Sequence, residues 1–189
     1  MKYIPVGAAG SAENLLRTWH AADEPTRQAG ARWYDEAHAE IKAIAERTGY
    51  TVPVATGITA VLSPFLNWDL NLRATEDFLS GRPTAGFGQN RTKARAIMAG
   101  ADPRQILSGP KVVAFYENIL WPGESNLVVV DRHIARLWYG GETRGQYGCS
   151  LPTYQRICAD VREAARAVGE RTHHFQAAVW LAARSKDNV

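Results

Sequence analysis

The chain of 189 residues is predicted to adopt an all-α fold, and two observations indicate this class. Long segments are rich in Ala, Glu, Arg and Leu, which favour helices over strands. Gly and Pro separate these segments, and both residues interrupt helices and permit turns. The run at residues 127–130 is short and β-branched, so it is predicted to be buried and extended. We therefore expect a single helical domain over residues 1–189 with a strand content near zero.

The boundaries of the predicted helices follow from these residues. Asp102 is suited to cap a short helix, and Pro103 to its first position. Breaks are expected at residues 49–53, 80–88 and 140–148. In chain order the predicted helices cover residues 12–22, 26–48, 54–63, 67–79 and 90–99, the short helix after Asp102, a helix from Pro110, one from Asp131 to about Trp138, and helices at about 152–168 and 172–184.

Length and composition exclude several classes of protein. A chain of this size buries a core without disulfide or metal staples. The apolar share of 46% and the charged share of 22% are ordinary for a soluble globular protein. The apolar runs are far shorter than the roughly 18 residues that a membrane span needs. Residues 1–7 lack the apolar core of a signal peptide. A cytosolic protein without a membrane partner is expected.

Cysteine and histidine usage predicts no cofactor. Cys149 and Cys158 are too few for a four-cysteine iron–sulfur cluster. They are expected to be a loop thiol and a core thiol of a reducing compartment. The adjacent pair His173-His174 has no further ligand at metal-binding spacing. We therefore predict neither an iron–sulfur cluster nor another metal site.

Two short strings about twenty positions apart carry the chemically informative residues. Gly109-Pro110-Lys111 places an amine in the first turn of an apolar helix, where it opposes the positive end of the helix dipole. That field, with partial burial, is expected to free the amine as a nucleophile. Val130-Asp131-Arg132-His133 places a carboxylate at the start of a later helix, where Asp is a favoured cap. Ten connecting residues span about 33 Å at full extension, enough for Asp131 to return beside Lys111.

These strings resemble the helix-hairpin-helix DNA glycosylase superfamily, which includes endonuclease III and the 8-oxoguanine glycosylases. Gly109-Pro110-Lys111 matches the end of the family hairpin, and Asp131-Arg132-His133-Ile134 is most similar to the archaeal 8-oxoguanine glycosylases. The resemblance covers about residues 55–140. It implies a helix-hairpin-helix glycosylase-like fold, with Lys111 as the Schiff-base nucleophile and Asp131 as the catalytic carboxylate. The family hairpin carries two glycines, and here Leu107 occupies the position of the first.

Further candidates surround these strings. The net charge of +3 and pI of about 9.0 are compatible with DNA binding. Arg91, Lys93, Arg95, Arg104 and Lys111 lie close together in sequence, either as phosphate contacts or as a solvated helix face. An extruded base needs stacking partners and polar groups at its edge. The candidate substrate or DNA contacts are Trp68, Phe87, Gln89, Arg91, Lys93, Ser108, Gly109, Arg132 and His133, with Asn90 and Gln176 as further readers of a base edge.

The resemblance implies a DNA glycosylase that excises a damaged or modified base, with Schiff-base (AP lyase) chemistry. The expected partner is double-stranded DNA, bound by a cytoplasmic, nucleoid-associated monomer. Two alternatives remain open: a transferase that modifies a hydroxymethylated thymine on the same scaffold, and a non-catalytic DNA-binding module. In the last case Lys111 would contact a phosphate and Asp131 would serve as a helix cap alone.

Overall fold

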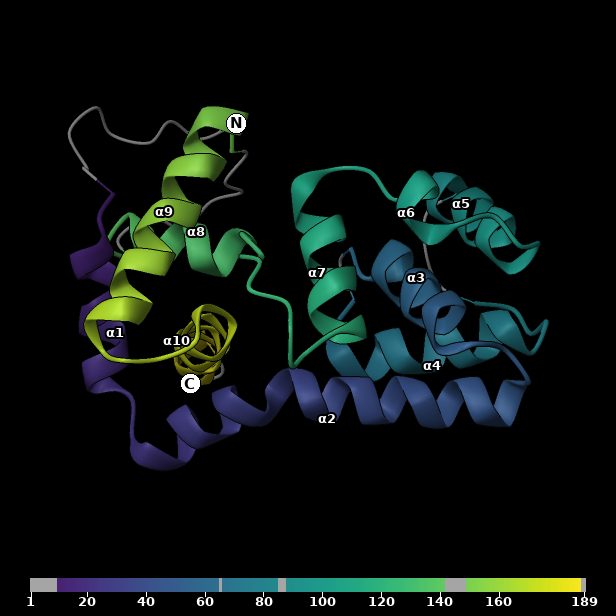
Figure 1. Cartoon of the computed structure of the whole chain (residues 1–189), viewed down its shortest axis with the longest axis horizontal. Helices are drawn as coiled ribbons and strands as arrows, with labels where there is room; N and C mark the ends of the chain where they lie inside the picture. Colours follow the sequence, from purple (N-terminus) through teal and green to yellow (C-terminus); the bar gives the residue numbers. More distant parts are fainter. Residues whose placement is uncertain (1–9, 65, 85–87, 142–148, 188–189) are drawn as a thin grey trace. The chain divides into compact units, whose positions relative to one another are not determined.

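A computed structural model describes residues 10–64, 66–84, 88–141 and 149–187 (Figure 1). Its regular structure over these ranges is helical throughout, which confirms the predicted all-α class. The helices are α1 (Ala12–Ala21), α2 (Glu24–Thr48), α3 (Val52–Leu62), α4 (Trp68–Leu79), α5 (Gly88–Met98), α6 (Pro103–Ile106), α7 (Pro110–Leu120), α8 (Arg132–Trp138), α9 (Leu151–Ala167) and α10 (Thr172–Asp187).

The observed helix ends lie within three residues of the predicted ones. The expected break at residues 49–53 is shorter than predicted, because Val52 and Pro53 already belong to α3. Proline is tolerated in the first turn, where its missing N–H has no helical acceptor. Within the described ranges, no helix combines the length and the apolarity that a membrane crossing requires.

The described residues form two compact units. The second unit is Tyr34–Ser125, and the first combines the residues up to Trp33 with those from Asn126 onward. The sequence predicted one domain, and the stretch covered by the resemblance, about residues 55–140, is divided between the two units. Helix α2 contributes its first ten residues to the first unit and the remainder to the second.

Helix α3 is the centre of the second unit. Residues 55–62 are all buried, and α3 contacts α4, α5, α6 and α7 (Figure 1). A helix that is apolar on every side belongs in an interior, which explains this placement. Gly57 permits the approach of α6, since a Cβ there would lie 2.9 Å from Cβ of Pro103.

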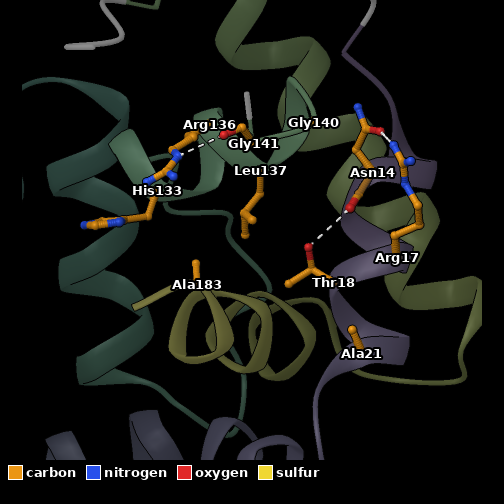
Figure 2. A pocket seen from close by; sticks show the side chains of 10 residues that line it. All are labelled: Asn14, Arg17, Thr18, Ala21, His133, Arg136, Leu137, Gly140, Gly141 and Ala183. Carbon is orange, nitrogen blue, oxygen red and sulfur yellow. Dashed lines mark hydrogen bonds between the residues drawn. The ribbon is translucent and has the colours of Figure 1, made fainter. Parts of the chain in front are cut away.

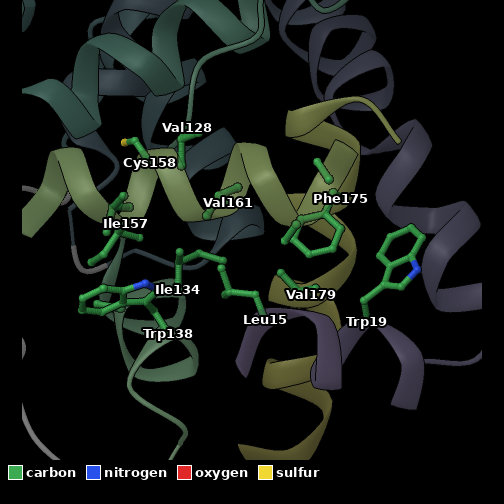
Figure 3. Packing of buried hydrophobic residues seen from close by; sticks show 14 of the residues in the cluster. Leu15, Trp19, Val128, Ile134, Trp138, Ile157, Cys158, Val161, Phe175 and Val179 are labelled. Atoms are coloured by element: carbon green, nitrogen blue, oxygen red, sulfur yellow. The ribbon is translucent and has the colours of Figure 1, made fainter. Parts of the chain in front are cut away.

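The first unit packs α1, α8, α9 and α10 around one core. Figure 3 shows Leu15, Ile134, Val161 and Phe175 among its members, all fully buried. The ring of Trp19 stacks on Phe175 with centroids 5.2 Å apart. Cys158 is buried in this core, whereas Cys149 precedes α9 and is partly exposed, so the predicted core thiol and loop thiol are both confirmed.

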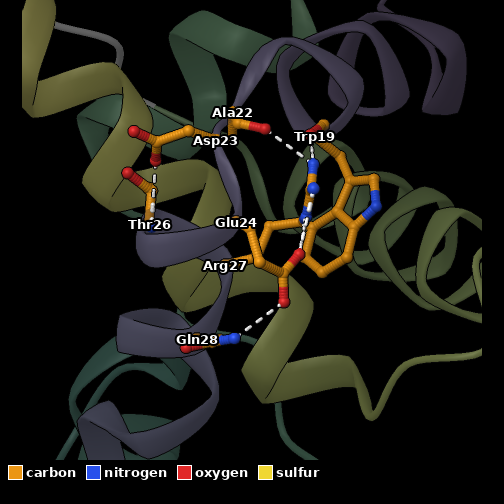
Figure 4. A network of polar contacts seen from close by, with 7 residues as sticks. All are labelled: Trp19, Ala22, Asp23, Glu24, Thr26, Arg27 and Gln28. Atoms are coloured by element: carbon orange, nitrogen blue, oxygen red, sulfur yellow. Dashed lines mark hydrogen bonds and ion pairs between the residues drawn. The ribbon is translucent and has the colours of Figure 1, made fainter.

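A polar network holds the corner between α1 and α2 (Figure 4). Asp23 accepts a hydrogen bond from the backbone N–H of Thr26 at 3.0 Å, and this bond caps α2. Arg27 donates to the carbonyl of Ala22 at 2.6 Å and to the carboxylate of Glu24 at 3.0 Å. Arg27 also donates to the carbonyl of Trp19 at 3.4 Å, so it satisfies carbonyls at the C-terminal end of α1.

A glycine inside α2 allows α10 to approach closely. A Cβ on Gly30 would lie 2.4 Å from the backbone N of Ala178, so one of the two helices would have to move. We expect Gly30→Ala to destabilise the protein by about 1–3 kcal/mol, the usual cost of overpacking. The melting temperature should fall by several degrees in a thermal unfolding experiment.

Gly88→Ala is the matched control for this substitution. Gly88 opens α5, and nothing lies within 4 Å of a Cβ built on it. Alanine there should leave the melting temperature unchanged or raise it slightly, since it restricts the unfolded chain. Equal melting temperatures for Gly30→Ala and Gly88→Ala would contradict the close packing of α2 and α10.

Candidate active site

The predicted hairpin is formed by α6 and α7, joined by residues 107–109. Asp102 caps α6 by accepting a hydrogen bond from the N–H of Arg104 at 2.9 Å, and Pro103 follows in the first turn, as predicted. Gly109 caps α7 with φ of +84°, a conformation that side chains rarely adopt. Pro110 then starts the helix. A tight turn between two helices thus leads directly to Lys111.

The structure explains why a leucine is accommodated where the resemblance expects a glycine. Leu107 has φ of −65°, an ordinary value for any residue. Its side chain is buried, with 7% of its surface exposed. This position therefore anchors the turn to the interior and requires no glycine, whereas Gly109 adopts the left-handed conformation.

Lys111 is the second residue of α7 and is partly exposed. Helix geometry gives the backbone amides of Lys111 and Val112 no acceptor inside α7, because the first intrahelical bond runs from Val113 to Gly109 at 3.2 Å. Gly109 has no side chain to cap them. The ammonium of Lys111 and two helix-starting amides therefore lie at the same end of α7.

The cations predicted around the hairpin are only partly brought together. Lys93 donates to the hydroxyl of Ser108 at 2.5 Å, so α5 supplies a cation at the hairpin turn. Arg104, in contrast, forms an ion pair with Glu117 at 2.7 Å. Its charge is therefore compensated within the second unit, and Arg104 does not add to a positive surface as the sequence suggested.

Asp131 caps α8 and is partly buried. Its Oδ1 accepts hydrogen bonds from the backbone amides of His133 and Ile134, each at 2.9 Å. Its Oδ2 accepts a third hydrogen bond from the indole Nε1 of Trp180 on α10, at 2.8 Å. The predicted cap is confirmed, and both oxygens of the carboxylate have donors.

Two side chains clamp the extended segment that leads to Asp131. The amide of Gln176 pairs with both backbone groups of Val129, at 2.7 Å to its N–H and 3.0 Å to its carbonyl. The hydroxyl of Tyr154 donates to the carbonyl of Val128 at 2.8 Å and accepts from the N–H of Val130 at 3.4 Å. Val128, Val129 and Val130 are buried, as predicted, whereas Leu127 is exposed against the prediction. Side chains satisfy the backbone groups of the segment in place of a neighbouring strand.

The clamp should make stability sensitive to alkaline pH. Burial raises the pKa of Tyr154 from 10.0 to about 12, and the hydrogen bond from Val130 opposes this only in part. A raised pKa means that the folded state holds the proton more tightly than the unfolded state. The contribution of Tyr154 is therefore complete below pH 10 and is lost as pH rises towards 12.

Urea unfolding between pH 9 and 12 measures this loss. Wild type should lose stability more steeply above pH 10 than Tyr154→Phe, which has no proton to lose at this position. Cys158, whose pKa burial raises to about 11, contributes its own loss from about pH 9 in both proteins. Parallel pH profiles for wild type and Tyr154→Phe would show that the hydroxyl is not buried in the clamp.

The remaining predicted contacts lie on separate elements. In the second unit, Trp68 opens α4, donates to Glu40 at 2.7 Å and packs edge-on against Phe115. Gln89 is exposed in the first turn of α5, and Asn90 and Arg91 follow it with partial exposure. Phe87 lies outside the described residues.

In the first unit, Arg132 is exposed and donates to the ring of His133 at 3.2 Å. Gln176 is buried with both ends of its amide bonded to Val129, so it holds the backbone and does not present an edge to a base. Trp180 was missed by the sequence reasoning, because its partner Asp131 is 49 positions away. Only the tertiary contact reveals it.

The first unit contains a pocket of about 480 Å³ between α1, α8 and α10 (Figure 2). Thr18, Leu137 and Ala183 face its interior, and Arg17 and Arg136 stand on its walls. The ring of His133 points away from Ala183 in Figure 2. His133, whose backbone amide donates to Asp131, is among the lining residues, whereas Asp131 itself is not.

Comparison with known protein families places the chain in one of them. Residues 3–187 match a family of unknown function, DUF7178. The chain belongs to this family. No curated protein and no solved structure matches it.

Proposed function

We propose that this DUF7178 protein is a DNA glycosylase that removes a damaged or modified base. The observation that carries the proposal is the hairpin of α6 and α7. It places Lys111, two helix-starting amides and Lys93 around one turn. Helix-starting amides and cations bind phosphate, and an amine beside a bound backbone is well placed to attack a sugar.

The proposed reaction uses two groups in sequence. The amine nitrogen of Lys111 attacks C1′ of the extruded nucleotide, the glycosidic bond breaks, and the base leaves with its electron pair and takes up a proton. Positive charge develops on the sugar as that bond breaks. The carboxylate of Asp131 stabilises this charge and assists removal of a proton from the attacking amine. The C1′–O4′ bond of the sugar then opens, O4′ takes up a proton, and the C1′=N Schiff base forms. Loss of a proton from C2′ and departure of the 3′ phosphate complete the β-elimination that nicks the strand.

The geometry of Asp131 supports this role. A carboxylate that stabilises a developing charge acts best when it is already oriented, since it then loses no energy to reorganisation during the reaction. Three hydrogen bonds hold Asp131, and it keeps partial access to solvent. The proposal requires Lys111 and Asp131 to act on the same nucleotide.

A panel of duplexes tests the proposal. Each duplex carries one of 8-oxoguanine, uracil, hydroxymethyluracil, thymine glycol or an alkylated purine. Base release is scored by mass spectrometry and nicking by denaturing electrophoresis. An abasic or nicked product from at least one duplex supports a glycosylase with lyase chemistry. An unmodified duplex, run alongside, reports background cleavage.

Two other results would replace the proposal with its alternatives. An intact strand with a heavier base, formed from the hydroxymethylated substrate, would indicate the transferase. Salt-dependent binding with no change of base or strand would indicate a DNA-binding module, because phosphate contacts alone weaken as salt rises.

A further inference from the structure

The indole of Trp180 reaches the one carboxylate oxygen of Asp131 that the helix cap does not use. Oδ1 is bound by two backbone amides of α8, and Oδ2 by Nε1 of Trp180 at 2.8 Å. The donor comes from α10, so the orientation of this acid depends on a second helix. Sequence alone predicts only the cap.

The cap by itself does not fix the orientation of the carboxylate plane, because both of its hydrogen bonds go to Oδ1. Rotation about the last torsion of an aspartate is broad, and a bond to one oxygen only weakly restricts it. A donor at the second oxygen narrows that range. The hydrogen bond from Trp180 therefore fixes a torsion that capping does not.

Trp180 is itself held in place by its neighbours in the first unit. Its ring meets Trp33 edge-on at 5.9 Å and His133 at 6.5 Å between centroids. The guanidinium of Arg184 lies 4.6 Å from the ring centroid, over its face. A side chain restrained on several sides makes a rigid donor, which suits an orienting role.

The chemistry of the donor also suits a charge-stabilising acid. An indole N–H is neutral, so it orients Asp131 without compensating its negative charge. A lysine or arginine in its place would pair with the carboxylate and weaken its attraction for a developing sugar cation. A neutral donor thus orients the carboxylate of Asp131 and leaves its negative charge available to the sugar cation.

We propose that Trp180 is the positioning residue of this site, and that its indole N–H holds the carboxylate of Asp131 in the orientation that base release requires. This inference rests on the proposed glycosylase function. Trp180 contacts Asp131 and acts through it, so its loss should affect the rate of the reaction and not the affinity for DNA.

Trp180→Phe is the informative variant, because it keeps the aromatic ring and removes the donor. Trp138→Phe is the matched control: Trp138 also lies in the first unit and donates through Nε1 to a carboxylate, that of Asp160, at 2.6 Å. Both variants lose one indole–carboxylate hydrogen bond. Only Trp180→Phe loses the bond to Asp131.

Single-turnover base release should fall about 10- to 100-fold in Trp180→Phe, the range expected when a reacting group is misplaced. The dissociation constant for the duplex should stay within about twofold of wild type, since no phosphate contact is altered. Trp138→Phe should keep the wild-type rate once corrected for its folded fraction. Rates that fall equally in both variants would overturn the inference and leave the glycosylase proposal standing.

A measurement that needs no activity tests the contact directly. In ¹H–¹⁵N spectra of the full chain, the indole resonance of Trp180 should move when Asp131 becomes Asn, because an amide NH₂ then faces the indole N–H. The resonance of Trp138 should stay in place. An unmoved Trp180 resonance would overturn the inference even if Trp180→Phe fails to fold. Absence of base release by wild type on every duplex would overturn both proposals together.

Discussion

Replacing Lys111 with glutamine is expected to abolish covalent trapping of the protein on lesion-bearing DNA. Borohydride reduces a Schiff base to a stable amine, so trapping reports directly on an attacking amine. Glutamine keeps a polar side chain, one atom shorter than lysine, but has no nucleophilic nitrogen. Since Lys111 lies at the first turn of α7 with partial exposure, its replacement should leave the hairpin folded.

The small number of lysines simplifies the assignment of the trapped amine. The chain contains Lys2, Lys42, Lys93, Lys111 and Lys186. Lys42 is exposed on α2 in the same unit as Lys111, so Lys42→Gln is the matched control and should trap as wild type does. Gel mobility after reduction measures the adduct.

The alternative role of Lys111 predicts a different pattern. A lysine that only contacts a phosphate would, on replacement, weaken DNA binding and reduce its salt dependence by about one counterion. Trapping would persist at saturating protein. Adducts of Lys111→Gln at the wild-type level under those conditions would remove this residue from the chemical step.

Replacing Asp131 with asparagine is expected to slow base release by about 100- to 1,000-fold, the loss typical of one preorganised electrostatic group. Asparagine retains an oxygen that can accept from the amides of His133 and Ile134, so α8 should keep its cap. The variant loses the negative charge that stabilises the sugar cation. Single-turnover kinetics on saturating protein separate this effect from binding.

Combining the two substitutions asks whether both residues act on one nucleotide. Groups that act as a unit are strongly non-additive: the double variant should be hardly slower than the slower single variant. Residues that act independently would multiply their losses. A fully multiplicative loss, or unchanged turnover in Asp131→Asn with its cap intact, would contradict the paired mechanism.

Local sequence determined the helices of this protein and their ends. Asp102 with Pro103 placed the start of α6, and Gly109 with Pro110 placed the start of α7, because capping and the fixed φ of proline act within one turn. Asp131 was predicted as the cap of α8 for the same reason. The burial of Val128, Val129 and Val130 before it followed from their apolar, β-branched side chains. All of these signals are short-range.

Tertiary structure decided which polar groups meet. Gln176 binds Val129 from 47 positions away, and Tyr154 binds Val128 from 26 positions away. The hydrogen bond from Trp180 to Asp131 joins residues 49 positions apart. Glu117 compensates Arg104, a pairing that a count of nearby cations does not reveal. Such contacts depend on how helices pack, and many pairings of the same residues are compatible with one helical pattern. Sequence therefore predicted Asp131 as a helix cap, and packing alone selected the indole that donates to its carboxylate.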